Sequence, residues 1–348
     1  MYKIRKIQLF FIFILISHSF VLAQETKSVH EKKDNEYAIL FRLDNDLIYG
    51  SDDYYTNGLY LGFVNLSESF DKSIFPNFIG HGLAHLPGLN PDGRMVSSSF
   101  SFAHRMFTPH DIQNRDFIPD DMPYSGQLLL SVSAGTQNSK HLDAWTLSIG
   151  EIGPVTRAAE LQFDVHYSLF APEAEGWNYQ LKNEVIVNLF YEHRFRFFEL
   201  GKSNRIFDTM LAGSGGLGNL TSFAELGFGF RLGWNIPNDF YLPTSKYVNP
   251  MIGIMPTTAS KRKLSCYFFA NISGAYVLNN IALDGNTFEE YSPYIEYDHF
   301  GTLLNCGFAF DLYKFRIIFT AASEKVTWEN SFNIKEDVYG QLSFCFGF

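Results

Sequence analysis

The chain of 348 residues is 46% hydrophobic and 17% aromatic, with 18% charged residues and a formal net charge of -10 at pH 7. Its 36 Phe and 19 Tyr exclude an intrinsically disordered chain, and the negative charge excludes a nucleic-acid partner reached through a basic surface. The charged fraction is below the roughly 25% of an average soluble domain, which suits a chain whose outer surface meets lipid.

Residues 1–23 have the pattern of a secretory signal peptide. Three basic residues open the segment, an apolar run covers residues 7–16, and Val21-Leu22-Ala23 offers a cleavage site. An uncleaved membrane anchor is the alternative, but the run is shorter than the roughly 20 apolar residues of a spanning helix. We therefore expect export and cleavage, followed by a loose polar extension over residues 24–36.

From residue 37 onward, large apolar side chains alternate with small or polar ones. The pattern is clearest in the last segment, where Leu342, Phe344 and Phe346 alternate with polar or small residues and the chain stops on Phe348. The same period of two recurs over residues 37–44, 56–63 and 184–192. Charged residues opposite large apolar ones fit a polar lumen and a lipid-facing exterior. A soluble β-sandwich is the alternative that alternation alone leaves open.

Further strand-like stretches lie near residues 98–107, 126–135, 142–152, 204–213, 221–235, 264–277, 279–289, 302–320 and 335–348. Allowing for splitting errors, the count is about twelve, and no linker or repeat divides the chain. The sequence therefore predicts an all-β fold: a single transmembrane antiparallel β-barrel of about 12 strands over residues 37–348, with a short helix in a rim loop.

An acidic group lies where the first predicted hairpin turns. Asp44-Asn45-Asp46 ends one strand, and Asp52-Asp53 precedes Thr56-Asn57-Gly58 at the start of the next. Carboxylate and amide oxygens are ligands for hard cations such as calcium. Asp, Asn and Gly are also ordinary turn residues, so composition leaves both interpretations open.

Residues 157–170 break the strand pattern and predict a helix. Ala158, Leu161, Val165 and Leu169 follow helical spacing, and the segment is flanked by Pro154 and Pro172.

On this helix Gln162 and His166 are four residues apart and share one face. A His can act as general base on water, and a neighbouring amide can orient the His or the substrate. A single His on a helix is also commonly structural. Glu173, Trp177 and Gln180 lie downstream.

Other chemistries find little support in the sequence. It contains no nucleophile elbow, no H-E-x-x-H zinc motif, no P-loop and no dinucleotide fingerprint. Three cysteines, Cys266, Cys306 and Cys345, form no C-x-x-C pair.

Taken in order, several short motifs resemble those of the LpxR-type lipid A deacylase family of Gram-negative outer membranes. They are Asn45-Asp46, Tyr55-Thr56-Asn57-Gly58, Phe107-Thr108-Pro109 with Asp111, Pro119-Asp120, Pro123-Tyr124-Ser125-Gly126, Gly150 to Pro154, Gln162-x-x-x-His166, and Gly176-Trp177 to Glu184. They span about residues 40–185, and the C-terminal half matches only as barrel strands.

The resemblance implies a twelve-stranded barrel in the cell outer membrane, with the active site between the barrel wall and the loop helix. It implies calcium-dependent hydrolysis of the 3′-O-linked acyloxyacyl ester of lipid A, the lipid part of lipopolysaccharide. His166 would be the base and Gln162 its partner on the helix. The oxygen donors implied for Ca²⁺ are Asn45, Asp46, Thr56 and, by a less direct match, Glu173. The C-terminal strand would engage the barrel-assembly machinery.

Two other functions stay open at this point. One is an outer-membrane phospholipase-like esterase that acts on another lipid. The other is a non-enzymatic barrel, either a porin or a structural protein. The sequence favours an enzyme because the helix, the histidine and the acidic hairpin occur together.

Overall fold

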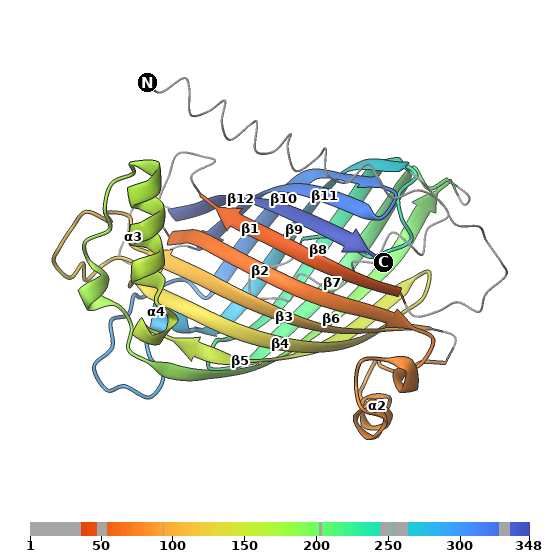
Figure 1. The fold of residues 1–348 in the computed structure, drawn as a ribbon, viewed down its shortest axis with the longest axis horizontal. Coiled ribbons are helices and arrows are strands. Elements are labelled where there is room, and N and C mark those ends of the chain that lie inside the picture. Colours follow the sequence, from red (N-terminus) through yellow and green to blue (C-terminus); the bar gives the residue numbers. More distant parts are fainter. Residues whose placement is uncertain are drawn as a thin grey trace. The chain divides into compact units, whose positions relative to one another are not determined.

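The structure, a computed structural model, describes residues 36–46, 54–92, 94–201, 204–243, 253, 264–326 and 335–348. Twelve antiparallel strands close into a barrel in which each pairs with its neighbours in the chain and β1 pairs with β12 (Figure 1). The strands are β1 (Glu36–Asn45), β2 (Tyr54–Ser67), β3 (Met95–Thr108), β4 (Ser125–Gln137), β5 (His141–Ile152), β6 (Glu184–Leu200), β7 (Phe207–Gly218), β8 (Thr221–Trp234), β9 (Leu264–Asn280), β10 (Phe300–Leu312), β11 (Phe315–Val326) and β12 (Lys335–Gly347).

The barrel closes along a seam between its first and last strands. The register runs from Ala38 opposite Gly347 to Asn45 opposite Gly340. Next to the pair of Ala38 and Gly347, the Phe348 amide donates to the Tyr37 carbonyl at 2.9 Å, and the Tyr37 amide donates to the Phe348 carbonyl at 3.2 Å. Closure pairs backbone groups that would otherwise form an exposed sheet edge.

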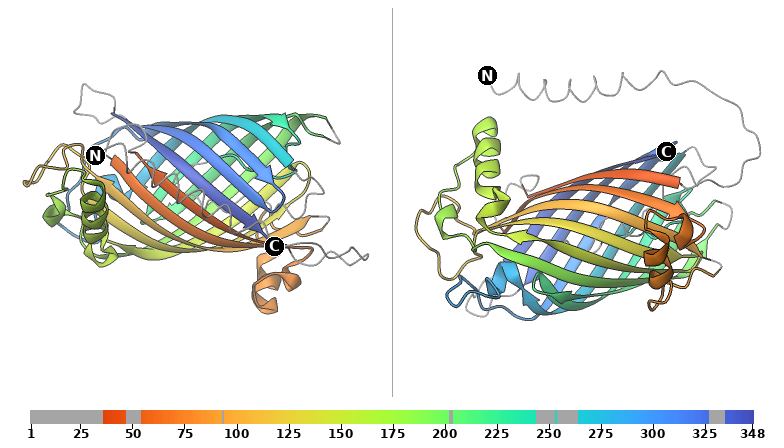
Figure 2. Two further views of the ribbon diagram at one scale, coloured as in Figure 1. Left: turned by 45° about the horizontal axis from the view of Figure 1, so that its top comes forward. Right: turned by 60° about the horizontal axis from the view of Figure 1, so that its bottom comes forward.

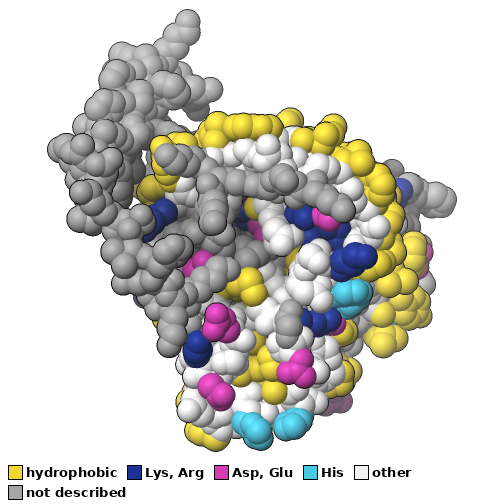
Figure 3. All heavy atoms as spheres, turned by 90° about the vertical axis from the view of Figure 1, so that its right-hand side faces the viewer, with side chains coloured by type: hydrophobic (Ala, Val, Ile, Leu, Met, Phe, Trp, Pro, Cys, Tyr) yellow, Lys and Arg dark blue, Asp and Glu magenta, His cyan; other side chains and the backbone are white. Residues whose placement is uncertain are grey.

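The predicted alternation sorts side chains between the exterior and the lumen. Leu61 on β2 is 53% exposed, whereas its neighbour Tyr60 is 1% exposed. Strands β1, β6 and β12 follow the same rule, with exposed Ile, Val, Leu or Phe alternating with buried residues, among them the polar Arg42, Asn188 and Ser343. Figure 3 looks onto one end of the barrel and shows hydrophobic side chains along the upper and right-hand parts of its outer edge. An apolar exterior and a polar interior are the pattern of a barrel in lipid.

Two expected strand boundaries were wrong. Residues 302–320 form two strands, β10 and β11, joined by a turn at Tyr313-Lys314. Residues 279–289 are not a strand, because β9 ends at Asn280 and the short helix α4 (Ile281–Asp284) follows. The Asn280 side chain caps α4 by accepting a bond from the Ala282 amide at 3.2 Å. One strand gained and one lost leave the expected count of twelve unchanged.

The expected helix over residues 157–170 is confirmed as α3 (Ala158–Leu169). The remaining helices are short: η1 (Phe70–Lys72), α2 (Asn77–Leu83), η2 (Pro154–Thr156) and η3 (Trp177–Tyr179). Among the described residues, no helix is both long and apolar enough to cross a membrane. The expected signal peptide and the extension before Glu36, where β1 begins, lie outside the described residues, as do Asp52 and Asp53.

The connections differ between the two ends of the barrel. Strands β1, β3 and β5 end at one rim of the barrel, which we call the α3 rim because the β5–β6 connection there carries α3. We call the opposite end the terminal rim, because Phe348 lies there. Figure 2 shows α3 and α4 at one end of the barrel and α2 at the other. The β2–β3 connection, with α2, packs through Phe70, Phe75 and Leu89 against the barrel wall at Val96 and Ala134.

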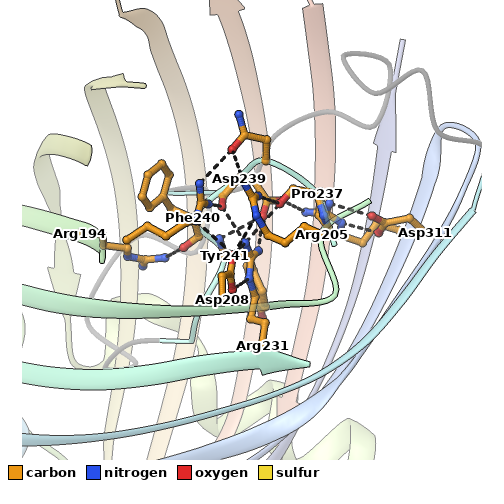
Figure 4. Close-up of polar contacts among 12 residues, drawn as sticks. Arg194, Arg205, Asp208, Arg231, Pro237, Asp239, Phe240, Tyr241 and Asp311 are labelled. Atoms are coloured by element: carbon orange, nitrogen blue, oxygen red, sulfur yellow. Dashed lines mark hydrogen bonds and ion pairs between the residues drawn. The ribbon is translucent and has the colours of Figure 1, made fainter. Parts of the chain in front are cut away.

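The lumen at the terminal rim is filled by part of the β8–β9 connection. Residues 236–242 enter the barrel, and Ile236, Phe240 and Leu242 are buried there. We call residues 236–242 the plug. Figure 4 shows the plug among arginines and aspartates that point inward from the strands.

Asp239 is the centre of this network. Its carboxylate accepts from Arg231 of β8 and Arg316 of β11, each at 2.5 Å. These arginines also bind Asp208 and Asp311, at 2.6 Å in each case. All of these charges are buried and paired, so the plug is bonded to the wall on several sides.

Candidate functional site

Helix α3 turns its polar side toward the barrel. Ala158, Gln162 and His166 lie one turn apart and are buried, with Gln162 at 2% and His166 at 3% exposure. Leu161 and Val165, whose spacing predicted the helix, are instead 39% and 40% exposed. The arrangement is the reverse of a helix on a water-soluble core, and it suits a helix whose outer side meets apolar surroundings.

The first turn of α3 packs closely against strand β4. A side chain at Gly126 would place its Cβ 2.1 Å from Thr156 Oγ1 and 2.4 Å from Ala158 Cβ. Glycine therefore allows the helix to approach the wall this closely. Ala158 also packs with Met106 of β3, Tyr124 and Trp177 in one buried cluster.

The C-terminal end of α3 orients His166. The helix ends where Phe170 takes a left-handed φ of 56°, and the Ala171 amide returns to the His166 carbonyl at 3.0 Å. This reversal brings the Pro172 carbonyl to 2.5 Å from His166 Nδ1. A carbonyl can only accept, so Nδ1 carries the proton and Nε2 of the neutral ring carries the lone pair. That tautomer is the one a general base needs.

Gln162 is held by the loop that follows the helix. Its Oε1 accepts a bond from Trp177 Nε1 at 2.7 Å, and the Trp177 ring lies 4.9 Å from that of Tyr124. This contact fixes the amide so that the acceptor faces Trp177 and the donor faces the other way. Gln162 Nε2 is buried and has no hydrogen-bond partner within the described part of the chain. A buried donor of this kind is available to a substrate oxygen.

The β1–β2 hairpin contributes the second group of candidate residues. Asn45 Nδ2 donates to the Thr56 carbonyl at 3.2 Å, and the Thr56 hydroxyl bonds that of Thr108 at 2.7 Å. Thr56 is the extra residue of a β-bulge in the pairing of β2 with β3. A bulge redirects the side chain it carries, and here it brings Thr56 to Thr108. Asp46 directly follows β1 and is fully buried.

Asp44 belongs to the lumen and not to this group. Its carboxylate pairs with Arg42 Nε at 2.9 Å and accepts from the Tyr55 hydroxyl at 2.8 Å. A further bond at 3.3 Å comes from Gln341 of β12. These contacts use the carboxylate inside the barrel.

The hairpin residues suit a hard cation. A buried carboxylate at Asp46, the amide oxygen of Asn45 and the hydroxyl of Thr56 are all oxygen donors of the kind Ca²⁺ binds, and none is a soft ligand. Because Asn45 Nδ2 donates to Thr56, the Asn45 Oδ1 atom points elsewhere. No three His, Cys, Asp or Glu side chains of the described residues cluster closely enough to hold a metal. A cation here would therefore depend on amide, hydroxyl or backbone oxygens beside Asp46.

A family model described as outer membrane protein LpxR matches residues 9–348. The chain belongs to the LpxR family. Among solved structures, LpxR from Salmonella typhimurium matches with a TM-score of 0.68 at 16% identity, covering 89% of this chain and 99% of that one. The beta domain of the Bordetella autotransporter Brka matches with a TM-score of 0.37 at 8% identity, covering 90% and 98%. No curated protein sequence gives a match.

Membership of the LpxR family makes this chain an outer-membrane protein, and the LpxR match confirms the predicted twelve-stranded barrel. The two groups of candidate residues lie at the same α3 rim of this LpxR-type barrel, one on α3 and one on the β1–β2 hairpin (Figures 1 and 2). Strand β3 connects them, because Met106 packs under α3 and Thr108 bonds Thr56.

Glu173 stands apart from the other candidates in this LpxR-family chain. It follows Pro172 in the loop after α3, and its side chain is exposed. It forms no hydrogen bond with Asn45, Asp46 or Thr56 in the described part of the chain. Its assignment as a calcium ligand stays a prediction.

Sequence reasoning did not assign roles to the residues that hold the site in place. Trp177, Thr108 and the Pro172 carbonyl each position a candidate residue. Trp177 and Thr108 do lie within the motifs that carry the LpxR resemblance, which was the available signal. The role of Pro172 comes from its backbone oxygen, and side-chain patterns do not report such a role.

Proposed function

We propose that this protein is a lipid A deacylase that hydrolyses the 3′-O-linked acyloxyacyl ester in a calcium-dependent reaction, with His166 as the general base. The observation that carries the proposal is the Nδ1 bond of buried His166 to the Pro172 carbonyl. Membership of the LpxR family supports the substrate class.

His166 would take a proton from the attacking water. With Nδ1 protonated and bonded, Nε2 is the nitrogen that accepts the proton, and the ring needs no rotation. Burial of the ring limits competition from bulk water. Direct attack by water requires no serine nucleophile, in agreement with the missing nucleophile elbow.

Gln162 would hold the ester. Its Nε2 group is a buried donor on the same helix face as His166, and Trp177 fixes its orientation. A donor placed before the reaction begins can stabilise charge that develops on the carbonyl oxygen.

Asn45, Asp46 and Thr56 would hold the calcium ion. When bound, the ion supplies positive charge beside the ester. The residues' own contribution is a buried carboxylate next to two neutral oxygen donors, all at the α3 rim.

Lipid would reach the site from the side of the barrel. The outer face of α3 carries exposed Phe163 and Tyr167, whose stacked rings are 6.2 Å apart. An aromatic surface beside a buried polar site suits a substrate with acyl chains and a polar ester. A porin is disfavoured, because the plug fills the lumen at the terminal rim.

The first test is mass spectrometry of lipid A from cells that express the wild type or His166→Ala. In the second test, both purified proteins are assayed on lipid A in the presence of calcium and in the presence of a chelator. The wild type in calcium should remove an acyloxyacyl mass. His166→Ala should lower the rate by at least about 100-fold, the lower range for a general base. Chelation should abolish the reaction.

His81→Ala is the matched control, since His81 is an exposed histidine on α2 at the other rim. It should behave as the wild type. Full activity of a correctly inserted His166→Ala protein would overturn the assignment of the base. Loss of a phospholipid acyl chain with lipid A intact would assign the site to an esterase of another lipid.

A further inference from the structure

A pocket of about 730 Å³ opens at the α3 rim, and neither His166 nor Gln162 lines it. It is lined by three connections: β3–β4 through Phe117 and Asp120, β5–β6 through Tyr179, and β9–β10 through residues 290–296. Its volume is within the range of about 300–1,000 Å³ that is typical of small-molecule sites.

Aromatic rings form much of the pocket wall. Tyr291 is 80% exposed and Tyr294 59%, so large rings of one loop stand open to solvent. Phe117 and Tyr179 face them from the other connections, with ring centroids 6.0 Å apart. Exposed aromatic side chains grouped around one hollow are a mark of a binding surface.

The polar lining is acidic. Asp120, Glu290 and Glu296 line the hollow, and none of the lining residues that the structure describes is basic. Two cations of these connections form ion pairs with residues outside the lining: Lys182 pairs with Glu289 at 2.6 Å, and Arg115 pairs with Glu175. Phosphates and carboxylates are therefore repelled. Hydroxyl and amine donors are favoured, since carboxylates only accept.

The pocket is preformed. Asn286 of the β9–β10 connection bonds both backbone groups of Lys182, each at 2.9 Å. Glu184 accepts from the Thr287 amide at 2.8 Å, and Ser292 accepts from the Asn286 amide at 2.7 Å. These bonds tie two of the three connections together. A site fixed in advance loses less conformational entropy when a ligand binds.

We infer that this pocket binds a saccharide that is neutral or carries amines, of about two to three sugar units. The C–H faces of pyranose rings are apolar and pack on aromatic faces, which carry partial negative charge. Sugar hydroxyls and amines donate to Asp120, Glu290 and Glu296. The inference does not depend on the deacylase reaction, because binding needs neither His166 nor calcium.

The test is saturation-transfer NMR and calorimetry on the full barrel in a polyoxyethylene detergent, which has neither a sugar nor a charged head group. The probes are the N-acetylglucosamine trimer, the glucosamine trimer and, as the anionic comparison, the galacturonic acid trimer. The wild type should bind one or both of the first two saturably in the micromolar to millimolar range and should not bind the third.

Tyr291→Ala combined with Tyr294→Ala should weaken binding at least about tenfold. Glu290→Gln combined with Glu296→Gln should weaken the glucosamine trimer more than the acetylated one, because only the former is cationic. Phe288→Ala is the matched control, since Phe288 is equally exposed in the same loop but does not line the pocket. It should bind as the wild type.

The absence of binding by the wild type, or equal binding by the double tyrosine variant, would overturn the inference. So would binding of an oligolysine or proline-rich peptide that the trimers do not displace. A free glycan and a glycolipid head group share this chemistry. The source is identified with the barrel in nanodiscs that contain a lipid with a trisaccharide head group. If this lipid displaces the free trimer, the site is assigned to a glycolipid. If the free trimer stays bound, the site is assigned to a free glycan.

Discussion

The orientation of His166 and Gln162 depends on residues 170–177, which follow them in the chain. Pro172 fixes the ring of His166 through a backbone oxygen, and Trp177 fixes the amide of Gln162 through its indole N–H. Both supports come from one loop, which is folded under the helix by the left-handed residue Phe170. If His166 and Gln162 act as proposed, changes in this loop should alter turnover while both side chains are retained.

Trp177→Phe tests this dependence. The ring that packs on Tyr124 is retained, and only the N–H that holds Gln162 is lost. We expect the hydrolysis rate to fall about two- to tenfold, as for the loss of one hydrogen bond of roughly 0.5–1.5 kcal/mol. The measurement is kcat and KM on purified lipid A.

Trp145→Phe is the control for that substitution. Its indole donates to the Pro87 carbonyl at 3.0 Å at the terminal rim, so an equivalent bond is lost far from the site. An equal loss of activity in both variants would mean that Trp177 acts only through general stability.

At this scale the sequence singles out His166 and Gln162 as candidates but not the residues that hold them in place. His166 and Gln162 are identifiable because side-chain type and helical spacing carry the signal. Thr108 was not assigned, because its contact with Thr56 depends on a bulge that only the pairing of β2 with β3 produces. Pairing across 52 residues is a tertiary property, and no local pattern reports it.

Among the elements, helix α3 buries its polar side and exposes apolar residues, which is the reverse of a helix on a water-soluble core. Its spacing of apolar residues correctly predicted a helix but not the side that it buries. In water the apolar side faces a core. Here the core side carries Gln162 and His166, and Phe163 and Tyr167 face outward.

Phe163→Ser combined with Tyr167→Ser should separate membrane access from chemistry. We expect activity on lipid A in vesicles to fall several-fold, because the two exposed rings no longer bury apolar surface in the lipid phase. Activity on lipid A in detergent micelles should change less. The control is Phe78→Ser on α2, a similarly exposed ring at the other rim. An equal fall in both assays would contradict a role in membrane access.

The strand boundaries show a second limit at the element scale. The turn between β10 and β11 is Tyr313-Lys314, and Tyr313 takes a φ of 52° that usually favours Gly or Asn. Because the turn itself has no Gly, Pro or Asn, residues 302–320 look like one long strand. The alternation itself was correct, because every strand has a lipid side and a lumen side.

For the whole molecule, the plug is bonded to several strands of the barrel wall at the terminal rim. Asp239 is bonded to arginines of β8 and β11, and its backbone carbonyl accepts from Arg196 of β6. Burial alone would raise the pKa of Asp239, but Arg316 and Arg231 lower the pKa to about 2. Because the pKa of this carboxyl is lower in the folded than in the unfolded state, ionised Asp239 stabilises the fold at pH values above the usual pKa of a carboxyl group. This contribution is lost as pH falls through about 2.

Asp239→Asn should therefore lower the free energy of unfolding at neutral pH by about 3–5 kcal/mol, the range for breaking a buried ion pair. The difference from the wild type should shrink as pH falls from about 4 toward 2. Urea titration of the barrel in lipid vesicles measures both. Asp71→Asn, at an exposed carboxylate of η1, should leave stability unchanged. A difference that grows on acidification would contradict the assigned charge state.

The seam between β1 and β12 has a kinetic consequence. Asp44 and Gln341, which bond across it, are separated by 297 residues in the chain. Contacts of such long range form late, because the entropy of closing a long loop must be overcome first. The hairpins can assemble in turn, but the circumference closes only after Phe348 has been synthesised and exported. Folding should therefore be slow and cooperative at its final step, with a long-lived open sheet that needs protection until the two ends meet.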